Sequence, residues 1–227
     1  MVHLETIAAL AFAPGLFWLW YFYRRDVFEP EPAWLIARTF LLGMLITLPV
    51  GVVEGLVSLA GLSDVYLVVV AAPVIEELGK FAVVFFTVYH DREFDEPIDG
   101  IEYAAAAALG FASLENARYV VLAYLSSPLE AIDTFAFRAF FSVPAHALIS
   151  SVWGYALGRA KFSGPSGSTA LIFWGLAIAI MLHGVFNLLA QLQMWIALLA
   201  LILLLVPLMW VLLNRNILLA LKFSRFR

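Results

Sequence analysis

The sequence contains no cysteine, so the protein has no disulfide bond and no thiolate to bind a metal. Charged residues are also scarce, because Asp, Glu, Lys and Arg together make up 13% of the 227 residues. Hydrophobic residues make up 64%, and the mean hydropathy is +0.96. This composition excludes a soluble globular protein and indicates a membrane protein with several spans.

Polar stretches long enough to form a soluble domain are missing as well. We expect an all-α, polytopic membrane helix bundle with about seven transmembrane helices, which forms a single integral-membrane domain over residues 1–227. Each apolar segment is long enough to cross a hydrocarbon core of about 30 Å. The predicted segments are roughly Leu4 to Tyr23, Trp34 to Ala60, Tyr66 to Tyr89, Ile101 to Leu125, Thr134 to Ala160, Thr169 to Leu192 and Trp195 to Leu213.

Lysine and arginine are absent from three of the predicted connections, Gly61 to Val65, Ser126 to Asp133 and Gln193 to Met194. The opposite connections and the C-terminal segment carry these cations. The positive-inside rule therefore predicts a multi-pass protein of the cell (inner or plasma) membrane, with the N-terminus outside and a basic cytoplasmic tail over residues 215–227. The first segment has no basic n-region, so we expect a mature helix there. The lipid bilayer is an expected partner, and nucleic acid is not.

Three ionisable residues interrupt the third apolar segment: Glu76, Glu77 and Lys80. An ionisable side chain at the centre of a membrane helix costs about 2.5–3.5 kcal/mol, so such residues usually mark a functional site. The three share one helix face, and an internal ion pair is the alternative interpretation. Lys80 can neutralise only one of the two carboxylates, so the other is left for a functional role.

Three later segments place polar residues at a similar depth: Glu115 with Asn116, then His146, then His183 with Asn187. Counted from the same membrane face, Glu76, Glu115, His146 and His183 all lie roughly 14–18 Å down their helices. This common layer predicts an intramembrane hydrolytic centre. Arg118 is an alternative partner for Glu115, and membrane histidines also link helices by hydrogen bonds. Glu54 and Arg138 are interpreted as interfacial and are left outside the site.

In combination, three motifs resemble those of the PrsW family of intramembrane proteases: EExxK at Glu76–Lys80, FxxxEN at Phe111–Asn116 and HxxFN at His183–Asn187. The family itself resembles type II CAAX prenyl endopeptidases more remotely. The resemblance covers the third to sixth predicted helices, about residues 66–192, which would form the catalytic core. It implies hydrolysis of a peptide bond near the extracytoplasmic side of a single-span membrane protein, in the manner of site-1 cleavage of an anti-sigma factor.

Two mechanisms remain open. In the first, Glu76 or Glu77 acts as the general base on a water molecule, a histidine protonates the leaving amine, and Asn187 or Asn116 stabilises the oxyanion. In the second, a divalent metal such as zinc is bound by residues from the set Glu76, Glu77, Glu115, His146 and His183. The zinc motif HExxH is absent, so spacing alone supports the metal only weakly.

Two other function classes compete with a protease. A non-catalytic membrane scaffold is the first, because the superfamily implied by the resemblance includes such proteins, although the retained Glu76–Glu77 pair argues against it. A proton or ion translocator is the second, since carboxylates and histidines at membrane depth also form proton relays. Uptake that depends on Glu76 would indicate a translocator, and cleavage that depends on it would indicate a protease.

Overall fold

The computed structural model describes residues 4–162, 168–192 and 194–224, and helices are the only regular elements within these ranges. The predicted all-α fold class is therefore confirmed for the described chain. The elements are α1 (Leu4–Tyr23), α2 (Ala33–Ser58), α3 (Asp64–Tyr66), η1 (Leu67–Ala71), α4 (Ala72–Thr87), α5 (Asp99–Ser126), α6 (Pro128–Phe137), η2 (Arg138–Ser142), α7 (Val143–Phe162), α8 (Ser168–Gln191), α9 (Trp195–Ala200), η3 (Leu201–Leu205) and α10 (Val206–Leu221). The three η elements are short π-helical stretches.

Each π-helical stretch joins two α-helices without a break, so the described chain forms 7 continuous helices. Four of them are long and apolar enough to cross a membrane: Ala33–Ser58, Pro128–Phe162, Ser168–Gln191 and Trp195–Leu221. Seven crossings thus remain a prediction. The last helix continues to Leu221, so the first part of the expected basic tail is helical, while residues 225–227 lie outside the described ranges.

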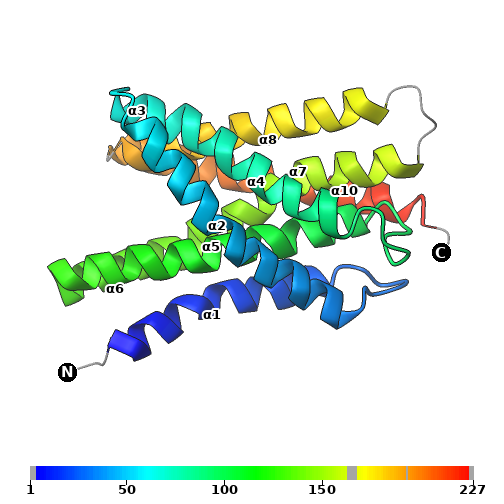
Figure 1. Ribbon diagram of the computed structural model, residues 1–227, viewed down its shortest axis with the longest axis horizontal. Coiled ribbons are helices and arrows are strands. Elements are labelled where there is room, and N and C mark those ends of the chain that lie inside the picture. The colour runs from blue at the N-terminus through cyan, green and yellow to red at the C-terminus, as the bar shows by residue number, and fades with distance from the viewer. Residues whose placement is uncertain (1–3, 163–167, 193, 225–227) are drawn as a thin grey trace.

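Helix α5 is the centre of the bundle and packs against α1, α2 and α7. Its first half is buried without interruption from Asp99 to Ser113, and the five alanines of Ala104–Ala108 are inaccessible to solvent. Small side chains let neighbouring helix backbones approach closely in a bundle that gains little from the hydrophobic effect within lipid. A Cβ on Gly110 would collide with the carbonyl oxygen of Phe40 on α2, which indicates how close that approach is. Figure 1 shows α2 crossing this part of the bundle diagonally.

Prolines explain where the π-helical stretches occur, because each stretch ends two residues before a proline: Pro73, Pro144 and Pro207. In η1 the N–H of Ala72 donates to the carbonyl of Leu67, so the next bond in this register would reach Val68. Pro73 has no N–H to make that bond. The side chain of Asn187 on α8 donates to the Val68 carbonyl instead, at 3.0 Å.

The second π-helical stretch follows the same rule. In η2 the N–H of Val143 donates to the carbonyl of Arg138, and Pro144 leaves the carbonyl of Ala139 without its helical donor. The indole Nε1 of Trp18 on α1 donates to this carbonyl at 3.2 Å. Each of these two prolines therefore fixes one neighbouring helix, because the carbonyl that it frees must find a donor within the bundle.

A substitution at Gly110 tests how closely α2 and α5 approach each other. We expect Gly110→Ala to lower the free energy of unfolding by about 1–3 kcal/mol, because the added methyl group must displace the Phe40 backbone. Gly51→Ala on α2 is the matched control, since no atom lies within 4 Å of the added Cβ. Alanine is the better helix former, so this control should leave stability unchanged or raise it by up to about 1 kcal/mol. Thermal unfolding in detergent measures both, and equal shifts would contradict a rigid contact.

Candidate active site

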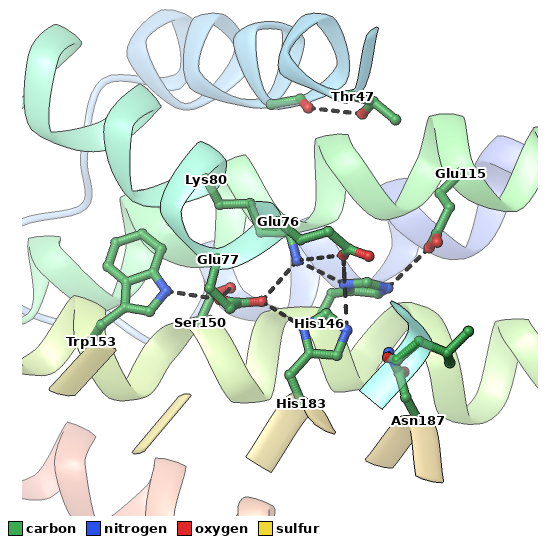
Figure 2. A network of polar contacts seen from close by, with 12 residues as sticks. Thr47, Glu76, Glu77, Lys80, Glu115, His146, Ser150, Trp153, His183 and Asn187 are labelled. Carbon is green, nitrogen blue, oxygen red and sulfur yellow. Dashed lines mark hydrogen bonds and ion pairs between the residues drawn. The ribbon is translucent and has the colours of Figure 1, made fainter. Parts of the chain in front are cut away.

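The three ionisable residues of α4 lie on the face that points into the bundle (Figure 2). Glu77 and Lys80 are completely buried, and Glu76 is 5% exposed. The Lys80 ammonium nitrogen lies 3.2 Å from Glu76 Oε2, 2.8 Å from Glu77 Oε1 and 3.0 Å from His146 Nδ1. It also lies 4.5 Å from the ring centre of Phe111, which adds a cation–π contact. One ammonium group therefore holds both glutamates and a histidine of α7 in fixed positions.

Glu77 is saturated by hydrogen bonds. In addition to Lys80, its carboxylate accepts from Ser150 Oγ at 2.7 Å and from Trp153 Nε1 at 2.9 Å, both on α7. His183 Nδ1 on α8 lies 2.9 Å from the other oxygen. A carboxylate with four donors and no exposed surface is not available to take a proton from water. Glu77 therefore positions α4 against α7 and α8.

Glu76 faces the two histidines. Its Oε2 lies 3.8 Å from His146 Nδ1 and 3.8 Å from His183 Nε2, and the two rings stand nearly perpendicular with their centres 5.1 Å apart. His183 contacts Glu77 through Nδ1, and His146 contacts Glu115 through Nε2 at 3.1 Å. When His183 donates its Nδ1–H to Glu77, its Nε2 lone pair faces Glu76. When His146 donates its Nε2–H to Glu115, its Nδ1 lone pair faces both the Lys80 ammonium and Glu76.

Glu115 is held by Arg138 rather than by Arg118. Arg138 Nη2 lies 2.8 Å from Glu115 Oε2, and Arg138 Nε donates to Asn116 Oδ1 at 3.2 Å. The amide nitrogen of Asn116 donates to the Ala11 carbonyl on α1 at 2.6 Å, and the side chain is completely buried. Asn116 therefore supports Arg138, and it is not among the residues that line the cavity beside Glu76.

A cavity of about 650 Å³ opens beside these groups. Glu76, Glu115, His146, His183 and Asn187 all line it, so the structure brings together the polar residues that the depth argument placed in one layer. Glu77, Lys80 and Asn116 lie behind its wall.

Two residues that sequence reasoning left outside the site, Glu54 and Arg138, also line this cavity. The helix that carries Arg138 begins at Pro128, earlier than the predicted Thr134, so Arg138 lies deeper than the sequence indicated. Glu54 lies one turn from the end of α2, and the cavity extends to that end. One of its carboxylate oxygens, Oε1, is buried and has no hydrogen-bond partner in the described chain.

The residue types and the spacing of Glu76, His146 and His183 match a metal site, and Lys80 contacts two of the same ligand atoms, His146 Nδ1 and Glu76 Oε2. One ligand atom from each lies within 4.8 Å of the others. Zinc bonds of about 2.0–2.2 Å place the ligand atoms of a tetrahedral site roughly 3.3–3.6 Å apart, close to the two separations of 3.8 Å measured from Glu76. Two imidazoles and one carboxylate form a common catalytic zinc set, and a carboxylate behind each histidine is the usual outer shell of such a site.

Glu77 and Glu76 are expected to differ in their effect on stability. Glu77→Gln removes the charge that balances the buried ammonium of Lys80 and should cost about 3–5 kcal/mol of unfolding free energy. Glu76→Gln is the matched control, and its cost should be smaller because Glu76 has Lys80 as its only close donor. Thermal unfolding of both variants in detergent measures the difference, and a larger loss in Glu76→Gln would contradict the positioning role of Glu77.

Comparisons with known proteins are consistent with this geometry. Residues 31–212 match the family model described as PrsW family intramembrane metalloprotease. Protease PrsW of Geobacillus kaustophilus (strain HTA426) is 34% identical over 184 residues, which cover 80% of this chain and 78% of the relative. Protease PrsW of Bacillus subtilis (strain 168) is 30% identical over 194 residues, which cover 84% and 86%. No solved structure matches the chain.

Proposed function

Since the chain belongs to the PrsW family of intramembrane metalloproteases, we propose that it is an endopeptidase that hydrolyses a peptide bond of a membrane-anchored protein. The observation that carries the proposal is the position of Glu76, His146 and His183 on the wall of one cavity, on helices α4, α7 and α8. This arrangement offers a place where water and a peptide carbonyl can meet within the bundle.

In this proposal Glu76, His146 and His183 hold a divalent metal, with zinc as the best match to two imidazoles and a carboxylate. A bound zinc ion lowers the pKa of a water molecule and polarises a carbonyl group. Glu77 fixes the orientation of His183, and Glu115 fixes that of His146. The expected glutamate pair therefore divides into Glu76, which reaches the cavity, and Glu77, which supports it from behind.

Proton transfer then needs a carboxylate outside the metal ligands, and Glu54 meets this requirement. It lines the same cavity as Glu76, and one of its oxygens has no hydrogen-bond partner in the described chain. Glu54 would accept a proton from the attacking water and deliver it to the leaving amine. Asn187 uses one N–H on the Val68 carbonyl, and its second N–H is available to the oxyanion.

The direction of the cavity favours cleavage near the extracytoplasmic side. Its lining reaches Ser58 at the end of α2, Leu67 in η1 and Gln191 at the end of α8. These ends adjoin the connections that lack lysine and arginine, which the positive-inside rule places outside. We therefore propose a multi-pass protein of the cell membrane with seven crossings and an outer N-terminus, whose substrate is a single-span protein of the anti-sigma-factor type.

Cleavage should depend on Glu76 and Glu54 in distinguishable ways. With purified protein in liposomes and a panel of tagged single-span proteins, Glu76→Gln and Glu54→Gln should each slow cleavage by about 100-fold or more. Glu76→Gln should also lose bound metal, whereas Glu54→Gln should keep it. Glu93→Gln, in the connection before α5, is the control and should cleave at the wild-type rate. Wild-type cleavage by Glu76→Gln would refute the proposed centre.

Metal content gives a second test that needs no substrate. Elemental analysis should find about one zinc ion per chain in the wild type, and His183→Ala should abolish it. Glu77→Gln should weaken zinc binding by about 10- to 100-fold, because it removes the carboxylate behind His183. His90→Ala is the matched control, since His90 is exposed in the connection after α4. Equal zinc content in all four proteins would place the metal elsewhere.

A further inference from the structure

A second group of buried carboxylates lies at the opposite end of the bundle from the cavity. It is built by the connection between α1 and α2, the connection between α4 and α5, and the first turn of α5. Figure 1 shows both connections at the end of the molecule where the C-terminus also lies. The five side chains are each 1–4% exposed: Asp26, Glu31, Glu96, Asp99 and Glu102.

Three of these residues bring carboxylate oxygens close together. Ligand atoms of Asp26, Glu96 and Asp99 lie within 4.8 Å of one another. Asp26 Oδ1 accepts the backbone N–H of Phe28 at 2.9 Å, and Asp99 Oδ2 accepts two backbone N–H groups, those of Asp95 and Glu96, at 2.7 Å each. Both connections therefore fold around a carboxylate oxygen, which fixes the direction of the second oxygen.

Several of the remaining oxygens have no partner within the described chain. Glu102 is 4% exposed and accepts the N–H of Asp26 at 3.3 Å through Oε1, whereas its Oε2 makes no hydrogen bond. Oδ2 of Asp26 and Oε1 of Glu31 are also buried without a hydrogen bond, although Tyr103 donates to the other oxygen of Glu31. Burying an acceptor without a donor lowers the stability of the folded protein, and burying a charged carboxylate in this way lowers it further.

Four of the five carboxylates have no ion-pair partner within the described part of the chain. Among the described residues, no lysine or arginine forms an ion pair with Asp26, Glu31, Asp99 or Glu102. Burial and repulsion from the neighbouring carboxylate of Asp99 raise the pKa of Glu31 to about 10, and burial raises the pKa of Asp99 to about 8. The group is thus a concentration of buried oxygen acceptors, and Lys161 is the cation that interacts with Asp99 and Glu31 through space.

We propose that Asp26, Glu96 and Asp99, with Glu102 beside them, bind a hard divalent cation of the Mg²⁺ or Ca²⁺ class. Carboxylate oxygens without any nitrogen or sulfur ligand are the set that such cations prefer. This site is separate from the proposed zinc centre, because Asp99 and Glu115 are roughly 24 Å apart along α5. The ion would tie the α1–α2 connection and the α4–α5 connection to the central helix.

Calorimetric titration of the full-length, EDTA-treated protein in detergent tests the site, with Ca²⁺ and Mg²⁺ used separately. We expect the wild type to bind about one ion per chain and to gain roughly 5–10 °C in Tm at an ion concentration of 100 times Kd. Asp26→Asn, which keeps the backbone contacts of Oδ1, and Glu102→Gln should each bind at least about 10-fold more weakly. Glu93→Gln, in the same connection as Glu96, and Glu76→Gln at the other end should bind like the wild type.

The stability of the variants without added ions distinguishes loss of the ion site from misfolding. Without added ions, Asp26→Asn should be at least as stable as the wild type, because it removes one of several like charges, and circular dichroism checks its fold. A wild type that responds to neither ion would overturn the proposal and leave a group that shares protons. Binding that is lost in Glu76→Gln but kept in Asp26→Asn and Glu102→Gln would also overturn it, since the ion would then lie in the glutamate–histidine centre.

Discussion

The buried ammonium group of Lys80 is the interaction on which the arrangement of the polar centre depends. A lone charge at this depth is strongly unfavourable, so its neighbours must compensate it. Glu76, Glu77 and His146 do so within 3.2 Å, and each belongs to a wider set of contacts. Glu77 extends the network to α8, and His146 extends it through Glu115 to Arg138. These ion pairs and hydrogen bonds thus fix how the helices align along one another, at a depth where apolar packing alone would let them slide.

The sequence was sufficient for the fold class and for the residues that meet in the centre. Apolar segments of membrane-crossing length predict helices directly, and counting residues from a common face placed Glu76, Glu115, His146 and His183 in one layer. Helix ends were less well predicted, and the misplaced start at Thr134 is why Arg138 was left out. The different surroundings of Glu76 and Glu77 could not be predicted, because the sequence does not show which neighbours surround two adjacent residues.

Two prolines, Pro73 and Pro144, also shape the polar centre. Pro73 and Pro144 each follow a π-helical stretch, and the structure shows how the bundle accommodates them. Each proline removes one donor, and the freed carbonyl is bound by a side chain from a distant helix, either Asn187 or Trp18. Asn187 is thereby held at the cavity wall by the same defect that widens α4 at its start. The π-helical stretch before Pro73 and the position of Asn187 in the site therefore have the same cause.

The distribution of the centre over three helices has a consequence for biosynthesis. Glu76 and His146 precede His183 in the chain, and the three come from α4, α7 and α8. A nascent chain that has emerged only as far as α7 therefore has two of the three donors and an open wall where α8 belongs. The order of synthesis therefore delays the completion of this set of side chains. It is complete only after α8 has entered the bilayer and packed against α4 and α7.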